Sequence, residues 1–308
     1  MVEKILLAEP RGFCAGVERA VETVERALTI YGTPVYVRHH IVHNERVIHE
    51  LEQKGAVFVD TLGQVPAGNL IIFSAHGTSP NVKEEAAARE LKMIDATCPL
   101  VTKVHLEALR YNRDGYSLLL IGHKKHQEVI GTMGYAPMIL IETVADAEKV
   151  TLPNHDKVAY LTQTTLSVDD TRNIIAALCR RFPNIRAPRT DDICYATQNR
   201  QDSVKALAER AQLILVLGDT TSSNSNRLVE TAINRGVQAH LIPDATAIDY
   251  HWMDEVHIIG ITAGASALEA AVQETIDALK LRYPHAAVET LTTTTEDMTF
   301  ALPKEVDV

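Results

Sequence analysis

Three of the four cysteines share one local setting, and cysteine thiolates bind metals or act as nucleophiles. Cys14 lies in "PRGFCAGVERA", Cys98 in "MIDATCPLVTKVH" and Cys194 in "TDDICYATQNRQ". Each follows an extended segment and precedes a run whose apolar residues have helical spacing. Taken singly, each cysteine is more simply a core residue. The repeated context, at separations of 84 and 96 residues, instead predicts three similar modules with one cysteine each.

Three thiols would converge if these modules packed around a pseudo-threefold axis. A closed structural zinc site has four ligands and commonly uses C-x-x-C pairs, which this sequence lacks. The four-cysteine run of a bacterial ferredoxin is also missing. A 4Fe–4S cluster held by three cysteines fits better, with one iron open to bind a substrate oxygen as a Lewis acid. Helix starts behind the thiols would lower their pKa.

The fourth cysteine, Cys179, has a different context. In "RNIIAALCRRFP" it shares an i, i+3, i+4, i+7 stripe with Ile175, Leu178 and Phe182. This pattern predicts a small residue in the hydrophobic core with no ligand role.

Other polar side chains that could bind a ligand also come just after apolar runs or at helix starts. Hydroxyls and backbone N–H groups at helix starts suit a phosphate, and histidines add charge-assisted hydrogen bonds. Each has a plainer interpretation, since Ser, Thr and Asn are ordinary helix caps and a lone histidine is usually a satisfied polar residue. Together they predict a cavity with donors for a diphosphate and one carboxylic acid. The residues are His43, His76, His123, His126, Glu128, Thr164, Thr165, Ser222, Ser223, Asn224 and Ser266.

Short apolar runs that alternate with amphipathic segments must position these residues. The alternation predicts an α/β fold with mainly parallel sheets, in which ligands bind beyond the carboxyl ends of the strands. We expect three modules at residues 1–98, 99–194 and 195–282 and a C-terminal tail at 283–308, with residues 290–299 as a loop. Expected strands are 4–8, 69–74, 92–96, 116–122, 138–142, 157–162, 212–218 and 255–262. Expected helices are 82–91, 99–111, 168–182, 200–211, 224–235 and 266–281.

Composition narrows the class of protein. The chain has 308 residues, 46% of them hydrophobic, and 40 acidic residues against 30 basic ones. This balance argues against a broad nucleic-acid surface, which needs clustered Lys and Arg. No apolar run approaches the ~20 residues of a membrane helix, and the N-terminus does not read as a signal peptide. We therefore expect a cytoplasmic protein with reduced thiols, no nucleic-acid partner and no membrane contact.

The quoted motifs, together with "YVRHHIVHN", "FSAHGTS", "TQTTLSVDDT", "SSNSNRL" and "TAGAS", closely resemble the 4-hydroxy-3-methylbut-2-enyl diphosphate reductase family. This family catalyses the last step of the non-mevalonate isoprenoid pathway, and the resemblance covers roughly residues 3 to 282. It implies three α/β modules in a trefoil around a central 4Fe–4S cluster, one per chain. One departure is Gln127, where the family more usually has proline.

The resemblance also implies a role for each matching residue. Cys14, Cys98 and Cys194 would hold the cluster. Glu128 would be the proton source, with Thr164 in the proton relay and beside the substrate, and His126 would be the third catalytic residue. The diphosphate would contact His43, His76, His126, Ser222, Ser223, Asn224 and Ser266.

The implied reaction is reductive dehydroxylation. Two electrons enter through the cluster, water leaves, and the allyl fragment is protonated to isopentenyl or dimethylallyl diphosphate. The implied electron donor is a small ferredoxin or flavodoxin.

Three other interpretations stay open at this point. Quinolinate synthase also resembles a three-module cluster architecture, but the serine-rich and histidine motifs favour a diphosphate over a dicarboxylate. A non-catalytic iron–sulfur sensor would be expected to carry a basic DNA-binding or partner-binding module. A zinc protein could use the three cysteines and a histidine.

Overall fold

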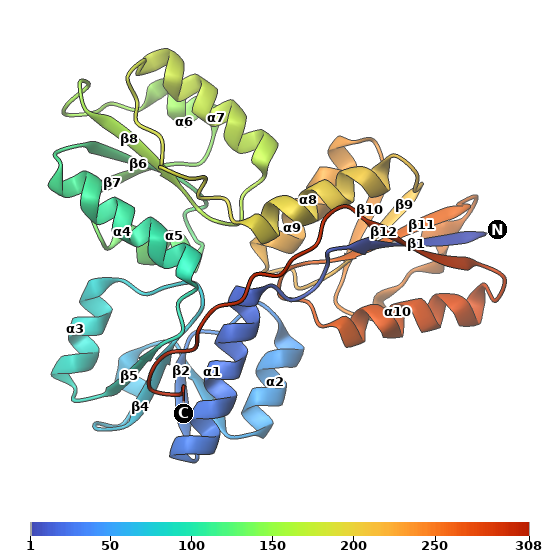
Figure 1. Ribbon diagram of the computed structural model, residues 1–308, viewed down its shortest axis with the longest axis horizontal. Coiled ribbons are helices and arrows are strands. Elements are labelled where there is room, and N and C mark those ends of the chain that lie inside the picture. The colour runs from blue at the N-terminus through green and yellow to red at the C-terminus, as the bar shows by residue number, and fades with distance from the viewer. Residues whose placement is uncertain (1, 308) are drawn as a thin grey trace. The chain divides into compact units, whose positions relative to one another are not determined.

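The computed structural model describes residues 2–307 and contains three separate parallel sheets (Figure 1). Their strand orders are β10-β9-β11-β1-β12, β3-β2-β4-β5 and β7-β6-β8. The strands are β1 Lys4–Glu9, β2 Val35–Arg38, β3 Ala56–Val59, β4 Leu70–Phe73, β5 Lys92–Asp95, β6 Ser117–Ile121, β7 Met138–Ile141, β8 Val158–Thr162, β9 Leu213–Leu217, β10 Gln238–Ile242, β11 Ile258–Ala263 and β12 Ala287–Thr292.

Helices connect the strands, as parallel pairing requires. Proline is the first residue of both α3 and α4, a position where its missing N–H costs nothing. The helices are α1 Ala15–Tyr31, α2 Glu45–Gln53, α3 Pro80–Ala88, α4 Pro99–Arg113, α5 Gln127–Met133, α6 Val144–Lys149, α7 Val168–Arg181, α8 Tyr195–Ala208, α9 Ser223–Asn234 and α10 Glu269–Arg282.

The chain divides into two compact units. Unit 1 comprises residues 2–15, 43–45 and 195–298 and contains the five-stranded sheet. Unit 2 comprises residues 16–42, 46–194 and 299–307 and contains the four-stranded and three-stranded sheets.

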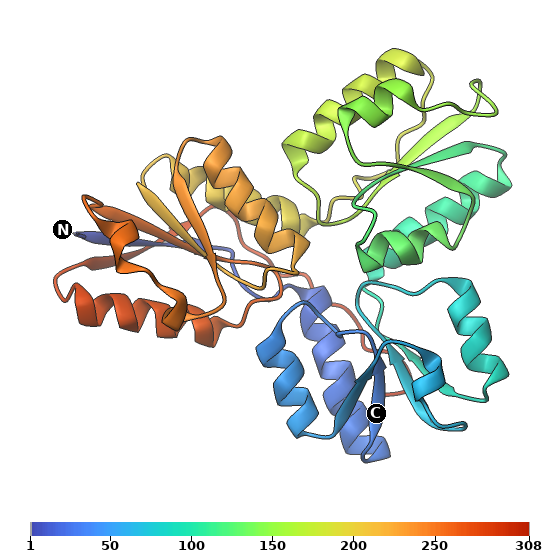
Figure 2. The same cartoon turned by 180° about the vertical axis from the view of Figure 1, so that it is seen from behind.

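The sheet of unit 1 has helices on both faces. Figures 1 and 2 show α8 and α9 on one face and α10 on the other. Strand β9 is buried at every residue, which explains its uninterrupted run "LILVL". Leu215 belongs to the same core cluster as Val272 of α10. Val216 belongs to the opposite cluster, with Leu207 of α8 and Leu228 of α9.

The three-stranded sheet of unit 2 follows the same rule. Leu119 of β6 packs in one cluster with Leu178 of α7. Leu120 packs in the opposite cluster with Val104 of α4 and Val129 of α5. Two-sided burial of the central strand makes the carboxyl edge of each sheet a rigid platform for the loops that follow.

The predicted α/β class with three parallel-sheet modules is confirmed, but the sheets depart from the predicted module boundaries at both chain ends. Strand β1 was assigned to the first module, yet it pairs with β11 and β12 in the sheet of the third. The predicted tail at 283–308 contains strand β12, and its residue Val306 is fully buried. Pairing between residues more than 250 positions apart leaves no local signal in the sequence. The strands β2, β3 and β10 were also missed.

The prediction for Cys179 is wrong, because the side chain is exposed. The buried stripe of α7 runs through Thr171, Ile174 and Leu178, so Cys179 lies one residue beyond it. A step of one residue turns a helical side chain by about 100°, which points Cys179 away from the core.

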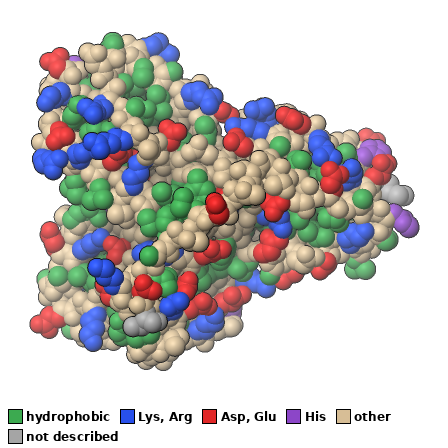
Figure 3. Space-filling model, viewed as in Figure 1, with side chains coloured by type: hydrophobic (Ala, Val, Ile, Leu, Met, Phe, Trp, Pro, Cys, Tyr) green, Lys and Arg blue, Asp and Glu red, His purple; other side chains and the backbone are tan. Residues whose placement is uncertain are grey.

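No helix among residues 2–307 is both long and apolar enough to cross a membrane. On the face shown in Figure 3, basic and acidic side chains are interspersed.

Candidate functional site

The three cysteines of the predicted cluster site occupy one repeated structural position. Each immediately precedes a helix, α1, α4 or α8, and each side chain is half-buried. The backbone N–H of each donates to a carbonyl two residues beyond the end of a neighbouring strand. The pairs are Cys14 to Ala265 at 3.2 Å, Cys98 to Ala75 at 3.0 Å and Cys194 to Thr164 at 3.0 Å.

This position has consequences for thiol chemistry. A side chain at a helix start lies near the positive end of the helix dipole, which favours a thiolate. None of the four cysteines forms a disulfide. The predicted repeat is present in part: all three cysteines precede a helix, but only Cys14 and Cys98 closely follow a strand, whereas the strand before Cys194, β8, ends at Thr162.

A second position also repeats, five residues beyond the ends of strands β2, β6 and β9. In each case the first residue after the strand donates its N–H to the last residue of the neighbouring strand. These bonds run from His39 to Val59 at 2.8 Å, from Gly122 to Ile141 at 3.1 Å and from Gly218 to Ile242 at 3.0 Å. The position is occupied by His43, His126 and Ser222, all of which were predicted to contact substrate.

Glu128 in unit 2 is the most unusual titratable group near these positions. Its side chain is buried and both carboxyl oxygens contact Thr164. The Thr164 backbone N–H donates to Oε1 at 2.6 Å, and its hydroxyl Oγ1 lies 2.8 Å from Oε2. Burial raises the pKa of Glu128 to about 7, the Thr164 hydrogen bonds lower it, and the charge of Asp192 raises it further. Glu128 can therefore hold a proton near neutral pH.

Thr164 also connects this carboxyl group to a cysteine. Its nitrogen and hydroxyl contact Glu128, while its carbonyl accepts the N–H of Cys194. A hydroxyl both donates and accepts, so it can pass a proton to or from the carboxyl group. The predicted pair of Glu128 and Thr164 is thus assembled beside a predicted ligand.

His126 and His76 stand beside one another in unit 2. Their ring centroids are 5.9 Å apart in an edge-on arrangement. His126 Nδ1 accepts the N–H of Glu128 at 3.2 Å, and His76 Nδ1 lies 3.3 Å from the Ser74 hydroxyl. Since Nδ1 of His126 accepts, its Nε2 carries the proton of a neutral ring.

Close packing of backbone holds these two histidines in place. Gly77 has a φ of +88°, and a Cβ there would lie 2.6 Å from the ring of His105. A Cβ on Gly131 of α5 would lie 3.1 Å from the carbonyl oxygen of Gly77. A side chain at Gly131 would therefore crowd the loop that carries His76. Gln127 is the first residue of α5, where proline is favoured but not required.

The predicted substrate residues of unit 1 gather where the loops after β2, β9 and β11 meet. The Ser266 hydroxyl donates to the His43 carbonyl at 2.9 Å, and Asn44 Nδ2 donates to the Ser266 carbonyl at 2.7 Å. Asn224 accepts the N–H of Ala265 at 2.8 Å. These bonds connect three loops through polar groups that are suited to an anion.

Ser222 and Ser223 begin α9 in the same region. Ser222 is the N-cap, and its hydroxyl accepts the N–H of Ser225 at 3.3 Å. Ser223 is the first residue of the helix and is half-buried. A helix N-terminus that carries hydroxyl side chains favours a phosphate.

The predicted residues therefore form two groups, one in each unit. Unit 1 contains Cys14, His43, Ser222, Ser223, Asn224 and Ser266, and unit 2 contains Cys98, Cys194, His76, His126, Glu128 and Thr164.

Sequence reasoning missed three charged residues that lie within a few positions of the cysteines in the sequence, namely Asp192, Lys103 and Arg200. Asp192 is buried, and its carboxyl group accepts the Thr162 N–H at 2.9 Å and contacts Lys103 Nζ at 3.0 Å. Burial raises the pKa of Asp192 to about 6, although Lys103 opposes the shift. Arg200 is fully buried in unit 1. Their only sequence signal was proximity to cysteine motifs.

The sequence matches the family model described as LytB protein over residues 5–280. It is 55% identical over 305 residues to an Azoarcus sp. protein named 4-hydroxy-3-methylbut-2-enyl diphosphate reductase, covering 98% of this chain and 97% of the relative. Identity to the protein of that name from Nitrosomonas europaea is 51% over 311 residues, covering 98% and 96%. The solved structure of E-1-hydroxy-2-methyl-but-2-enyl-4-diphosphate reductase from Plasmodium falciparum matches with a TM-score of 0.97 and 39% identity, covering 99% of this chain and 97% of that one.

Proposed function

Because this chain belongs to the LytB protein family, we propose that it reductively removes the hydroxyl group of 4-hydroxy-3-methylbut-2-enyl diphosphate. The substrate takes up two electrons and two protons. Its carbon–oxygen bond breaks, water leaves, and a new carbon–hydrogen bond forms at one of two carbons. The products are isopentenyl and dimethylallyl diphosphate.

We propose that Cys14, Cys98 and Cys194 hold one 4Fe–4S cluster per chain. Support comes from their shared position before a helix and from thiols that are half-buried. Among residues 2–307 no group of three or more His, Cys, Asp or Glu side chains is placed to hold a metal ion, so the support lies in the repeated backbone position of the cysteines. When bound, such a cluster would supply the electrons and a Lewis-acidic iron with one open position.

The chain's own residues would supply binding and protons. Ser222, Ser223, Asn224 and Ser266 of unit 1, with the three histidines His43, His76 and His126, would bind the diphosphate. Glu128 would donate a proton to the departing hydroxyl oxygen and Thr164 would orient it. The observation that carries this assignment is Thr164 itself, which contacts Glu128 on one side and Cys194 on the other.

We further propose that the electron donor is a small ferredoxin or flavodoxin. The cytoplasmic location and the lack of nucleic-acid and membrane partners stay predictions from composition.

Anaerobic purification followed by metal analysis and a product assay tests the function. The protein should be brown and contain about four iron and four sulfide per chain. With a chemical reductant it should convert the substrate to the two isomeric diphosphates. Zinc in place of iron, with no visible absorption after anaerobic reconstitution, would contradict the cluster. A loaded protein that forms neither product would contradict the reaction.

A further inference from the structure

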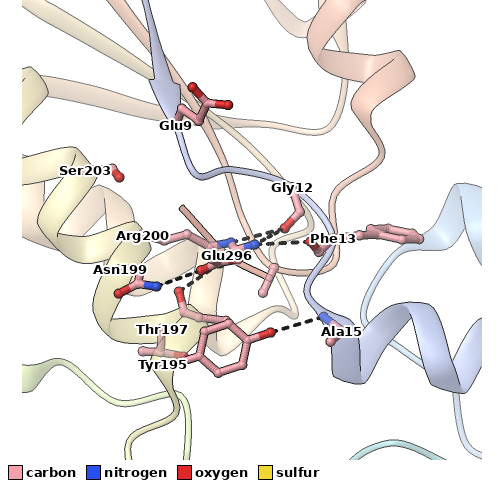
Figure 4. Close-up of polar contacts among 12 residues, drawn as sticks. Glu9, Gly12, Phe13, Ala15, Tyr195, Thr197, Asn199, Arg200, Ser203 and Glu296 are labelled. Carbon is pink, nitrogen blue, oxygen red and sulfur yellow. Dashed lines mark hydrogen bonds and ion pairs between the residues drawn. The ribbon is translucent and has the colours of Figure 1, made fainter. Parts of the chain in front are cut away.

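Arg200 is completely buried in unit 1 and holds the backbone that leads into Cys14 (Figure 4). Its Nε and Nη2 donate to the Gly12 carbonyl at 3.1 and 2.7 Å, and Nη2 also donates to the Phe13 carbonyl at 3.2 Å. Nη1 donates to the two carboxylate oxygens of Glu296 at 3.0 and 3.2 Å. A buried guanidinium group needs such partners, since an unpaired charge is costly to desolvate. Arg200 thus fixes the two carbonyls ahead of Cys14.

The backbone on the other side of Cys14 is held as well. Its own N–H donates to Ala265, and the N–H of Ala15 donates to the Tyr195 hydroxyl at 3.3 Å. Figure 4 shows the Tyr195 ring directed at the Ala15 amide. The first residues of α1 and α8 are therefore hydrogen-bonded to each other.

Arg19 of α1 has the corresponding relation to Cys98 in unit 2. Its Nη1 donates to the carbonyl of Thr97, the residue before Cys98, at 3.1 Å. Its Nε donates to the Ala301 carbonyl at 2.7 Å. Arg19 therefore holds the carbonyl of the residue directly ahead of Cys98.

Lys103 of α4 completes the pattern at the segment before Cys194. Its Nζ donates to the carbonyls of Thr190 and Asp191 at 2.6 and 3.0 Å, and to Asp192 Oδ1 at 3.0 Å. These three acceptors lie two to four residues ahead of Cys194.

The three contacts follow one cyclic rule. The helix after Cys14 holds the approach to Cys98, the helix after Cys98 holds the approach to Cys194, and the helix after Cys194 holds the approach to Cys14. Each cation follows its own cysteine by five or six residues, and each contact lies within one unit. The three cations are Arg19, Lys103 and Arg200.

We infer that these three cations are positioning residues that hold the cysteine loops and place positive charge around the group the cysteines bind. The inference rests on the proposed function, because it takes that group to be the 4Fe–4S cluster. Three thiolates and a cluster carry net negative charge, so nearby cations stabilise the reduced form most. Hydrogen bonds to the carbonyls ahead of a cysteine fix the loop before the cluster binds, which slows its loss.

Variants that remove the charge and variants that keep it separate the effect of charge on the cluster's potential from the effect of the hydrogen bonds on cluster retention. We expect Arg19→Met, Lys103→Met and Arg200→Met each to lose iron to a chelator roughly 10- to 100-fold faster than wild type. Their cluster midpoint potentials should become more negative. Arg200→Lys keeps the charge but replaces the three guanidinium nitrogens that reach Gly12, Phe13 and Glu296 with a single nitrogen. It should lose iron faster while its potential stays near wild type.

Arg210→Met is the matched control, because Arg210 pairs with Glu289 on the surface, and its loss removes the same charge. Arg210→Met should leave the rate of iron release and the cluster midpoint potential unchanged. The inference is overturned if the three Met variants behave like Arg210→Met.

If a Met variant fails to fold, Arg200→Lys and Lys103→Arg provide the test. A wild-type rate of iron release in both would contradict the role of the cations in holding the loops. A wild-type chain that takes up no iron overturns the proposed function and this inference with it, whereas a loaded wild type with unaffected variants overturns the inference alone.

Discussion

Unit 1 and unit 2 offer different chemistry to a ligand. Unit 1 presents mainly hydroxyl and amide groups at helix starts, with Ser222, Ser223 and Asn224 on one helix. Unit 2 presents a buried carboxyl group beside Thr164, together with two adjacent histidines. Hydroxyl and amide groups are uncharged and do not titrate at physiological pH, whereas Glu128, with a pKa of about 7, does. We therefore expect unit 2 alone to supply the proton, whereas both units contribute to diphosphate binding, unit 2 through His76 and His126.

Glu128→Gln should break this division most strongly. The amide keeps the size of the carboxyl group but cannot act as an acid. We expect kcat to fall by roughly 100-fold or more, with normal iron content and substrate affinity within about tenfold of wild type. Steady-state kinetics with saturating reductant gives kcat, and a binding titration gives the affinity. Near wild-type turnover would show that another group donates the proton, and Thr164 with an ordered water would be the next candidate. A collapse of binding would mean that Glu128 organises the pocket.

The pH profile tests the same carboxyl group without a mutation at the site. Since burial raises the pKa of Glu128 to about 7, kcat/KM should fall as pH rises through 7 and approach a tenfold loss per pH unit above it. The Glu128→Gln variant should not show this fall of kcat/KM above pH 7. A flat profile between pH 6 and 9 would show that no acid with this pKa limits the reaction.

The raised pKa also predicts a pH effect on stability. The folded protein binds the Glu128 proton more tightly than the unfolded chain does, so the contribution of Glu128 to stability is fully present below about pH 4.5 and is lost as pH rises to about 7. A shift of this size corresponds to about 3 kcal/mol. Anaerobic melting curves at several pH values should show that the Tm difference between wild type and Glu128→Gln changes in this range. A constant difference would contradict the raised pKa.

Sequence reasoning succeeded where the signal was local. For Cys14 and Cys98, a strand, the cysteine and a helix start occur within a dozen residues, so motifs alone could predict these two settings, whereas Cys194 shares only the helix start. The division of strands among sheets could not be, because β1 pairs with strands from the other end of the chain. Arg200 illustrates a second limit, since a charged residue on a helix normally reads as surface, and its burial depends on Glu296 almost a hundred residues away.

Ser223→Ala probes unit 1 and should have the opposite kinetic signature to Glu128→Gln. Ser223 begins α9, where its hydroxyl would donate to the diphosphate. Loss of one hydrogen bond to a charged group costs about 1.5–3 kcal/mol, which corresponds to roughly a 10- to 100-fold rise in KM. We expect kcat to stay within about twofold, because this contact is equal in ground and transition states. A fall in kcat at unchanged KM would contradict the division of labour between the units.

Replacement of Cys179 has the smallest expected effect. It tests whether the position of a cysteine at a helix start, and not its residue type alone, makes it a cluster ligand. Cys179 lies in unit 2 like Cys98 and Cys194, but it is exposed on the last turn of α7 rather than at a helix start. Little packing is lost on removal of an exposed thiol, and alanine has a higher helix propensity. Cys179→Ala should therefore change the free energy of unfolding by less than about 0.5 kcal/mol and leave iron content and turnover intact. Cys14→Ser, as the positive control, should lose both. If Cys179→Ala lost as much iron as Cys14→Ser, the helix-start position would not identify the ligands, and the assignment of the three cysteines would have to be revised.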